Sequence, residues 1–331
     1  MPAVQRPSTA KRGRTYAEVE KILAKGDVKG KLTRDDLPTP ALILDLDAFE
    51  FNVAKMASHC KNYGLALRPH GKSHKCPEIA KALIRAGAVG CCAAKLSEGE
   101  VFTGRMGIMP GEPALGLAQL ISTMPNLKLS GIQAYAGHAA HVIGWDERRK
   151  VSQTAMARAI ETSGLFQTHG IECSLLTGGS TGVYDIDSDI KGITELQPGS
   201  FIFMDVDYGR IGGKDGPVYQ DFRNSLSVLT TVVSKPSDSL AIVDGGYKAF
   251  STDKPFTPEA KGISGIGYSW GGDEHGKLDV AKASAPLNVG TRLEFIIPHC
   301  DPSVNLYDRI HCLRGDSVEA VWKIAARGMS Q

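Results

Sequence analysis

Short apolar runs alternate with amphipathic segments along the first two thirds of the chain, and this alternation constrains the fold more than any other feature. Residues 41–46 are predicted to form a buried strand, and Phe49, Val53 and Met56 then repeat at helical spacing. Further strand and helix patterns follow, up to a last apolar run at residues 201–204. Strands that alternate with helices form parallel sheets covered by helices, so the sequence predicts an α/β fold.

The pattern changes after residue 222. Apolar runs at residues 225–233 and 240–243 are separated by turns rich in proline, glycine, serine and aspartate, which is typical of strands joined by short connections. The sequence therefore predicts a second, mainly antiparallel β domain. A short helix is predicted near the N-terminus, at residues 16–23.

Lys72 lies in the most informative motif of the chain, LALRPHGKSHK at residues 65–75, where an apolar run ends. Neighbouring positive groups and partial burial disfavour the charged form of its amine. A neutral lysine amine is a nucleophile that forms a Schiff base with carbonyl cofactors, of which pyridoxal phosphate is the commonest. The alternative interpretation is a basic surface loop after a strand.

Two further segments lie where strands of the parallel sheet are predicted to end, and barrel enzymes place their active sites at such strand ends. The first, residues 135–138, carries Tyr135 as a side chain that can line a cofactor site. It also carries His138, which is either a catalytic base or a hydrogen-bonded loop histidine.

The second segment is TGGSTG, residues 177–182. Its glycines let backbone amides approach an anion closely, and its hydroxyl groups are further donors. Such a run is often only a turn. Because it faces the predicted Schiff-base lysine, we interpret it as a cradle for the cofactor phosphate, made by Gly179, Ser180 and Thr181.

His299 and Asp301 form a candidate metal site in the segment PHCDP. In extended backbone, residues two apart point to the same side, so both side chains could bind one cation while Cys300 points away. A pair of this kind is also common by coincidence. Carboxylate with imidazole suits manganese, magnesium or calcium, whereas a thiolate would suit zinc.

The motif from Arg68 to Lys75 resembles the cofactor-lysine motif of the D-threonine aldolase and D-serine dehydratase family, which are fold-type III pyridoxal phosphate enzymes related to the alanine racemase N-terminal barrel. The resemblance extends from residues 37–40 to residues 299–302. It implies a (β/α)8-type barrel at residues 48–221. It also implies a β-rich domain, built from residues 1–47 and 222–331, that carries the metal motif.

The resemblance also implies roles for individual residues. Lys72 would carry the cofactor, and Arg105 would approach the cofactor ring oxygen, although it could equally be a surface residue. His138 would lie where the β-hydroxyl of the substrate is deprotonated. His299 and Asp301 match the family's metal ligands, and an aspartate at position 301 resembles the aldolase branch, whereas a cysteine there would resemble the dehydratase branch.

The implied activity is cleavage of D-threonine or a related D-3-hydroxy-α-amino acid to glycine and an aldehyde, dependent on pyridoxal phosphate and a divalent metal. The same residues could instead drive β-elimination of the hydroxyl group, as in a D-serine or 3-hydroxyaspartate dehydratase. A third alternative is a shortened homologue that binds the cofactor without activity.

The third alternative arises because the chain is interrupted relative to the family. Ser97 and Glu100 match a capping box, which predicts the start of a helix. Gly104 follows too soon for a helix of ordinary length. We count about five parallel strands, whereas a closed barrel needs eight. The third to fifth units of the barrel are expected to be missing at the boundary between Phe102 and Thr103.

Composition excludes some classes of partner. With 38 basic and 36 acidic residues the net charge is +2, which gives no electrostatic case for nucleic acid or a membrane surface. Seven cysteines without a C-x-x-C pair argue against a disulfide framework, so a cytoplasmic location is expected. The expected partner is the small-molecule substrate, together with a second copy in a possible homodimer.

Overall fold

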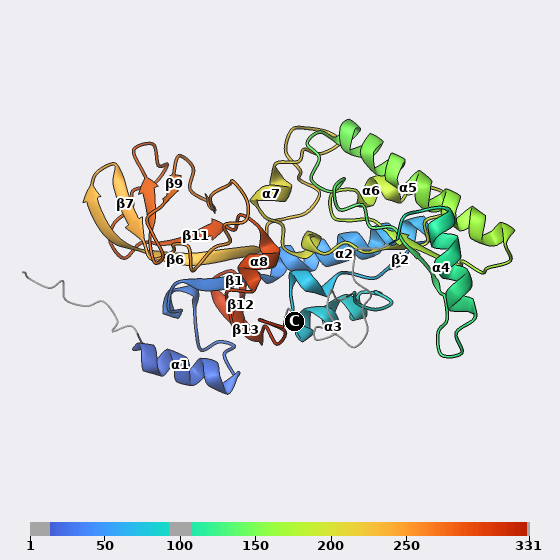
Figure 1. The fold of residues 1–331 in the computed structure, drawn as a ribbon. Coiled ribbons are helices and arrows are strands. Elements are labelled where there is room, and N and C mark those ends of the chain that lie inside the picture. The colour runs from blue at the N-terminus through green and yellow to red at the C-terminus, as the bar shows by residue number, and fades with distance from the viewer. Residues whose placement is uncertain (1–13, 93–107, 330–331) are drawn as a thin grey trace, which may run out of the picture.

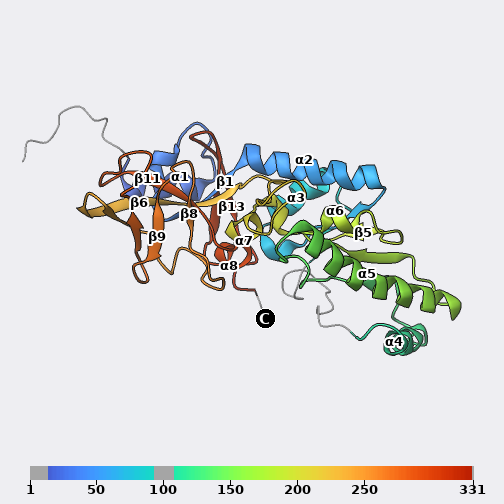
Figure 2. The same ribbon diagram turned by 90° about the horizontal axis from the view of Figure 1, so that it is seen from above.

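Two sheets lie side by side in the computed structural model, which describes residues 14–92 and 108–329 (Figure 1). A nine-stranded, largely antiparallel sheet forms one half, and a four-stranded parallel sheet forms the other. Seen from above, helices α2 to α5 lie with the parallel sheet at one end of the molecule (Figure 2). The architecture is the predicted combination of an α/β half and a β-rich half.

The elements have definite bounds within the described residues. The helices are α1 Tyr16–Lys25, α2 Leu46–Tyr63, α3 Pro77–Arg85, α4 Glu112–Ser122, α5 Trp145–Thr168, α6 Tyr184–Asp187, α7 Val206–Gly209 and α8 Cys300–Val304, with 3₁₀ turns η1 Arg34–Asp36, η2 Gly71–Ser73 and η4 Ser200–Ile202. The parallel strands are β2 Ala66–Leu67, β3 Gly131–Gln133, β4 Leu175–Gly178 and β5 Glu195–Leu196. The strands of the larger sheet are β1 Ala41–Asp45, β6 Leu226–Ser237, β7 Leu240–Val243, β8 Glu259–Ala260, β9 Gly267–Trp270, β10 Gly276–Asp279, β11 Arg292–Ile296, β12 Arg309–Arg314 and β13 Ser317–Lys323.

Helix α2 connects the two sheets, because it begins where β1 ends and leads to β2. The Asp45 carboxylate caps the helix by accepting a hydrogen bond from the Ala48 N–H at 3.1 Å. Gly64 ends it in the left-handed conformation that favours glycine. Its inward side chains pack in the main core and include the predicted set Phe49, Val53 and Met56.

The parallel strands form an arc in the order β2-β5-β4-β3. Beyond β2 the arc continues through a single parallel bridge between His70 and Cys92. The described residues therefore hold four parallel strands and one isolated parallel bridge, and they form an open, barrel-like arc. The boundary between Phe102 and Thr103 lies outside the described residues.

The larger sheet joins segments from both ends of the chain. Strand β1 pairs in parallel with β12 and antiparallel with β6, near the centre of the sheet. Helix α1 packs Val19 and Leu23 against the same sheet in a second, smaller core. The boundaries of the two predicted domains, at residues 47/48 and 221/222, stay predictions.

One predicted strand is wrong. Residues 201–204 form the 3₁₀ turn η4 and its end, and Met204 has a left-handed φ of 56°. The strand of this region is β5, which lies just before the run. Because Phe201, Ile202 and Phe203 are all buried, the run is as apolar as a buried strand although it turns, and apolarity alone does not distinguish the two.

The described helices give no candidate for a membrane span, since none combines the necessary length with the necessary apolar character.

Candidate active site

The two predicted functional motifs meet in space. Lys72 lies in η2, directly after β2, and its backbone N–H donates to Nδ1 of His70 at 3.2 Å. The Nζ atom of Lys72 forms an ion pair with Oδ2 of Asp301, a residue of α8 that lies 229 positions later in the chain. This contact joins the α/β half to the β-rich half, and it brings the predicted cofactor lysine to the predicted metal segment.

A cavity of about 40 Å³ surrounds Lys72. Residues from the ends of β2, β3, β4 and β5 line it, as expected for the C-terminal edge of parallel strands. Of the predicted site residues, the cavity is lined by Lys72, Tyr135, Ser180, Thr181 and His299. Sequence reasoning missed other lining residues, which include His70, His141, Gln197, Gly199 and Tyr208.

The loop after β4 has the close backbone approach that a phosphate cradle needs. Gly179 has a φ of 72°, which favours glycine. A Cβ atom on Gly182 would lie 2.1 Å from the Ala140 carbonyl oxygen, so a larger residue would not fit there. Gly179 and Gly182 of the predicted TGGSTG segment are therefore required by the loop itself.

The two hydroxyl groups of this loop have different roles. The Thr181 Oγ1 atom accepts a hydrogen bond from the Phe201 N–H at 2.9 Å, so it ties the loop to η4. The Ser180 Oγ atom is buried and has no hydrogen-bond partner among the described residues. A buried hydroxyl without a partner is costly, and an anion in the adjacent cavity would satisfy it. The residues present thus fit a cofactor phosphate beside Lys72.

His141, which follows β3 by eight residues, lies beside a carboxylate. Its Nδ1 lies 3.1 Å from Oδ2 of Asp207 in α7, and the Lys254 Nζ lies 2.7 Å from the same oxygen. Burial opposes ionisation of Asp207, but the neighbouring His141 and Lys254 prevail and lower its pKa to about 2. His141 therefore has one ring nitrogen beside a fixed negative charge and also lines the cavity of Lys72.

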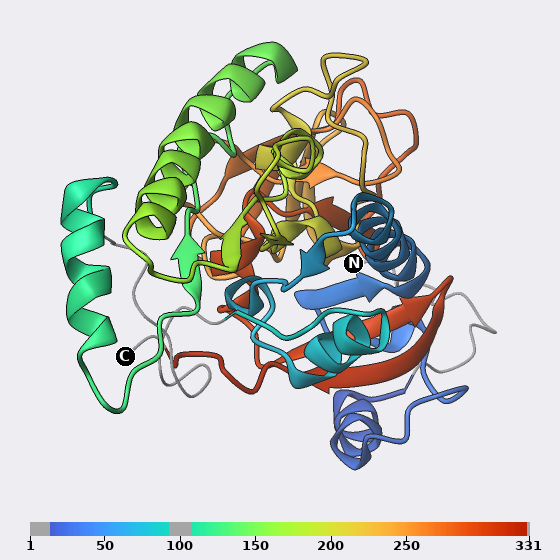
Figure 3. The same ribbon diagram turned by 90° about the vertical axis from the view of Figure 1, so that its right-hand side faces the viewer.

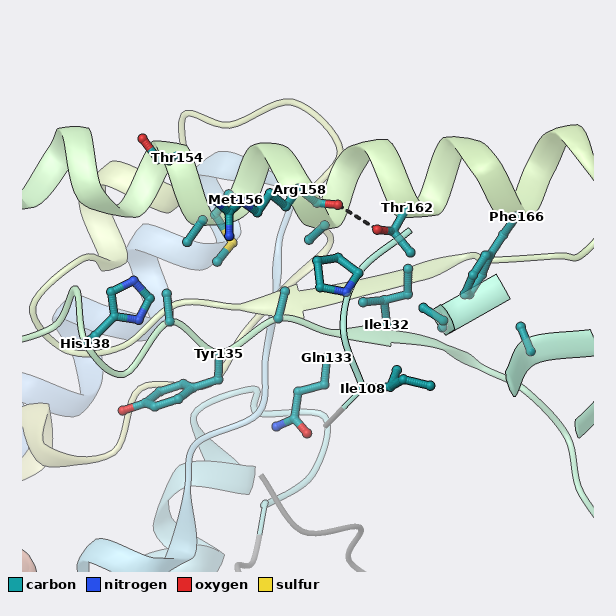
Figure 4. A pocket seen from close by; sticks show the side chains of 18 of the residues that line it. Ile108, Ile132, Gln133, Tyr135, His138, Thr154, Met156, Arg158, Thr162 and Phe166 are labelled. Carbon is teal, nitrogen blue, oxygen red and sulfur yellow. Dashed lines mark hydrogen bonds between the residues drawn. The ribbon is translucent and has the colours of Figure 1, made fainter. Parts of the chain in front are cut away.

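His138 lies elsewhere. Its side chain is exposed and lines a separate, larger groove beside α5, as the close-up of that groove shows (Figure 4). Tyr135 lines both spaces. The structure thus brings His141, rather than the predicted His138, to the cavity of Lys72. Arg105 lies outside the described residues.

The metal segment differs in backbone from the prediction. The sequence predicts extended backbone from His299 to Asp301, but only His299 is extended, because residues 300–304 form the helix α8. An aspartate in the first turn, followed by Pro302, favours a helix start at this point. As a result the two side chains have different partners: Asp301 pairs with Lys72, and the His299 Nδ1 lies 2.6 Å from Oδ2 of Asp253.

The donor atoms of this segment suit a hard divalent cation. No cluster of three His, Cys, Asp or Glu side chains arranged for a metal occurs in the described ranges 14–92 and 108–329. Magnesium and similar ions, however, commonly keep several waters and take only one or two carboxylates from the protein. One imidazole and one carboxylate beside the cavity therefore fit manganese or magnesium.

Asp205 fixes the start of α8. Its Oδ2 accepts a hydrogen bond from the Cys300 N–H at 2.8 Å, and its Oδ1 caps α7 through the Tyr208 N–H at 2.9 Å. Burial raises the pKa of Asp205. One buried carboxyl group thus holds together the helix that carries Asp207 and the helix that carries Asp301.

The fold and the site together define a class of protein. A lysine and a glycine-rich loop lie at the C-terminal edge of a barrel-like parallel sheet, beside a β-rich half, and this arrangement is alanine racemase-like. An alanine racemase of Clostridium difficile 630 superposes with a TM-score of 0.64 over 87% of this chain and 99% of that chain, at 12% identity. The D-threonine aldolase of Filomicrobium marinum superposes with a TM-score of 0.86 over 92% of this chain and 99% of that chain, at 30% identity.

Sequence comparisons identify the family within this class. The chain is 33% identical to a D-threonine aldolase of Arthrobacter sp, covering 88% of this chain and 93% of that protein. It is 30% identical to a 3-hydroxy-D-aspartate aldolase of Paracoccus denitrificans (strain Pd 1222), covering 90% of this chain and 94% of that protein. Residues 225–313 match the family model "Putative serine dehydratase domain". The chain belongs to the D-threonine aldolase and D-serine dehydratase family, whose fold implies pyridoxal phosphate as cofactor.

The comparison with the Arthrobacter protein also bears on the predicted interruption. That alignment is 358 positions long but covers 88% of this chain, and 88% of 331 residues is about 291. About 67 aligned positions of the relative therefore have no counterpart here. This total equals about two β/α units at the usual 30 or more residues each.

Proposed function

We propose that this chain is an aldolase that cleaves D-threonine, or a related D-3-hydroxy-α-amino acid, into glycine and an aldehyde, with pyridoxal phosphate and a divalent metal as cofactors. The observation that carries the proposal is that Lys72 and His299 line one cavity, while Asp301 forms an ion pair with Lys72. Cofactor and metal would then act on the same substrate molecule.

Pyridoxal phosphate would be held by residues from three strand ends. The Lys72 amine is the group that attaches it, and the Ser180 hydroxyl with the loop of Gly179 would bind its phosphate. Tyr135 would form a wall of the same site. When bound, this cofactor supplies an electron sink for the pair of electrons released when a bond at the substrate α-carbon breaks.

His299 and Asp301 would hold the divalent ion, which supplies Lewis acidity toward the substrate hydroxyl group. The Lys72 ammonium now pairs with Oδ2 of Asp301, so an ion bound to that oxygen would displace Lys72 from it. The ion would thus replace one positive partner of Asp301 by another. Asp253 beside His299 would orient the imidazole.

His141 is the residue best placed to receive the proton of the substrate β-hydroxyl. Its Nδ1 lies beside the Asp207 carboxylate, which would favour a proton on that nitrogen and leave Nε2 as the acceptor. A base held in this way by a carboxylate is pre-oriented and stabilised once protonated. Lys254, on the same carboxylate, limits the negative charge that Asp207 presents to the ring. His138, predicted for this role from the sequence, lines a different space.

The test is incubation of the purified protein with pyridoxal phosphate, manganese and D-threonine. Formation of acetaldehyde and glycine supports the aldolase. Formation of 2-oxobutanoate and ammonia would instead identify a dehydratase, which the same residues could support by elimination of the hydroxyl group. L-threonine and the Lys72→Ala variant are the controls. Binding of the cofactor without either set of products would identify an inactive homologue. This alternative is kept because the arc of parallel strands is open in the described residues.

A further inference from the structure

The segment after β13 returns from the β-rich half to the motif that contains Lys72. The red chain leaves the sheet and runs to the region of α3, the helix that follows η2 (Figure 1). The view from the α/β end shows it passing beside the cyan chain there (Figure 3). Ile324 fixes this segment, because its side chain is buried and its N–H donates to the Asp308 carbonyl oxygen at 2.9 Å. Residues 325–328 then form a turn.

One amide of the 325–328 turn binds the Lys72 motif. The Ala326 N–H donates to the Lys75 carbonyl oxygen at 3.1 Å. Lys75 has a left-handed φ of 48°, which is uncommon for a residue with a side chain and persists where the surrounding contacts hold it. Its own N–H donates to the Gly71 carbonyl oxygen at 2.8 Å and so closes η2 around Lys72. The bond from Ala326 therefore fixes the residue that completes η2.

A second amide of the same turn binds α8. The Gly328 N–H donates to Oδ1 of Asn305, the residue that ends α8, at 3.0 Å. Asn305 lies four residues after Asp301, as Lys75 lies three residues after Lys72. The turn thus contacts both segments whose side chains form the Lys72–Asp301 ion pair. The described residues that line the cavity of Lys72 include none of the residues of these two bonds.

The two bonds act on the relative position of η2 and α8, which belong to different halves of the molecule. An ion pair between long side chains does not by itself fix the backbones that carry them, because such side chains have several rotamers. The bonds of the 325–328 turn reach the Lys75 carbonyl and the residue that ends α8. The turn itself is closed by the Arg327 N–H, which donates to the Ile324 carbonyl oxygen at 3.1 Å, so the connection between the two segments is short.

We propose that Asn305 is a positioning residue, which sets where Lys72 stands relative to Asp301 through the 325–328 turn. The inference rests on the proposed function, in which Lys72 attaches the cofactor and Asp301 holds the metal ion. A contact outside the cavity then controls how these two side chains act together. Each of the two bonds is a neutral hydrogen bond of ordinary length, so loss of one should loosen η2 relative to α8 without unfolding the protein.

Hydrogen exchange of the purified apoprotein tests the positioning without any cofactor. Asn305→Ala removes the bond on the α8 side, and we expect faster exchange of the amides of residues 70–75, at the other end of the connection. Ala326→Pro removes the N–H that binds Lys75, and it should speed exchange in residues 300–304. Arg327→Ala is the matched control, since it removes an exposed ion pair of the same turn with Asp308 and leaves both bonds in place. Exchange in both segments should then stay within roughly twofold of the wild type.

Titration with pyridoxal phosphate gives a result that simple destabilisation would not give. In the wild type, Asp301 competes with the cofactor for the Lys72 amine. Because Asn305→Ala lets the two groups separate, the cofactor should bind this variant roughly threefold more tightly in the absence of manganese. With manganese, kcat for D-threonine should fall about tenfold or more with little change in KM, since a displacement of about 1 Å can cost about 10²-fold in rate. Asn305→Asp keeps an acceptor for the Gly328 N–H and should resemble the wild type in both measurements.

Two results would overturn the proposal. One is exchange of residues 70–75 that stays at the wild-type rate in Asn305→Ala, because the turn would then not connect the two segments. The other is binding of pyridoxal phosphate that Asn305→Ala does not tighten, because Asn305 would then not hold Asp301 beside Lys72. Circular dichroism melting of each variant verifies the fold. A protein that shows the exchange effects but neither binds pyridoxal phosphate nor cleaves D-threonine would refute the proposed function while supporting the connection through Asn305.

Discussion

The ammonium group of Lys72 and the carboxylate of Asp301 form an ion pair between two cofactor sites that the sequence predicts separately. Both side chains are largely shielded, with exposed fractions of 29% and 15%. The paired carboxylate stabilises the charged form of the Lys72 amine, whereas attachment of a carbonyl cofactor requires the neutral form. Any cation that binds Asp301 in place of Lys72 would therefore assist attachment of the cofactor.

We expect manganese to tighten the binding of pyridoxal phosphate. Because the ion takes the Asp301 carboxylate away from Lys72, the apparent dissociation constant should fall roughly fivefold, as expected for loss of a partly buried ion pair. The measurement is an absorbance titration of the apoprotein with pyridoxal phosphate, with and without manganese. In Asp301→Asn the manganese effect should vanish, and an unchanged effect in that variant would contradict the explanation.

Lys72 is expected to be the residue that carries the cofactor. Borohydride reduction of the cofactor-loaded protein, followed by peptide mapping, should locate the reduced cofactor on Lys72. The Lys72→Ala variant should lose the visible absorbance of the bound cofactor. Lys75→Asn is the control, since asparagine tolerates the left-handed φ of 48° at this position. Reduced cofactor found on Lys75 would defeat the assignment.

The fold and part of the site follow from local patterns in the sequence. The capping of α2, its apolar spacing, and the turns that separate β6 from β7 are all encoded by neighbouring residues. The Lys72 motif and the TGGSTG loop were found because their chemistry is contained in a few consecutive residues.

The rest depends on contacts between distant segments. His141 could not be distinguished from His138, because the difference comes from Asp207 and Lys254, which lie on other elements. The helix at residues 300–304 was missed because a two-residue spacing suggested extended backbone, while Asp205 holds the actual turn from 95 positions away. The buried carboxyl group of Asp205 carried no local signal of this role.

Arg148 illustrates the same limit. Its fully buried guanidinium donates to four carbonyl groups, which belong to Val142, Gly182, Ile211 and Gly212 at 2.7–2.9 Å. These carbonyls lie on three loops that surround the site, so this one side chain fixes the loop of His141 relative to the loop of Ser180. In the sequence it is only one of several basic residues at the start of a helix.

Replacement of Ser180 should separate cofactor binding from stability. Its hydroxyl has no partner among the described residues, so Ser180→Ala should leave the melting temperature of the apoprotein unchanged or slightly higher. Loss of a hydrogen bond to a charged phosphate should raise the dissociation constant of pyridoxal phosphate roughly tenfold. Thr181→Ala should behave differently and lower the melting temperature, because it removes the hydrogen bond to the Phe201 N–H. Equal effects of both variants on stability would argue against the assignment.

The variants His141→Asn and His138→Asn are a matched pair that tests which histidine acts as the base. Loss of a positioned general base commonly lowers turnover by about 10²–10⁴-fold, and we expect an effect of this size for His141→Asn with D-threonine. His138→Asn should retain activity within roughly threefold, because its side chain lies in the groove beside α5. The absorbance of the bound cofactor should persist in both. The reverse order of activities would restore His138 as the base.

The last prediction concerns stability and rests on Asp187, a fully buried residue at the end of α6. Ser152 donates a hydrogen bond to its Oδ1 at 2.5 Å, but burial dominates and raises the pKa of Asp187 from 3.8 to about 7. The stability that protonated Asp187 provides is complete below pH 3.8 and is lost as the pH rises through about 7. Asp187→Asn remains neutral at every pH, so it should stabilise the apoprotein at pH 8.5 by roughly 1–4 kcal/mol and have little effect near pH 4. Thermal melting at both pH values checks this expectation. Equal destabilisation of the variant at both pH values would contradict it. That outcome would show that the carboxyl group contributes to stability through its hydrogen bonds and that its charge has no effect.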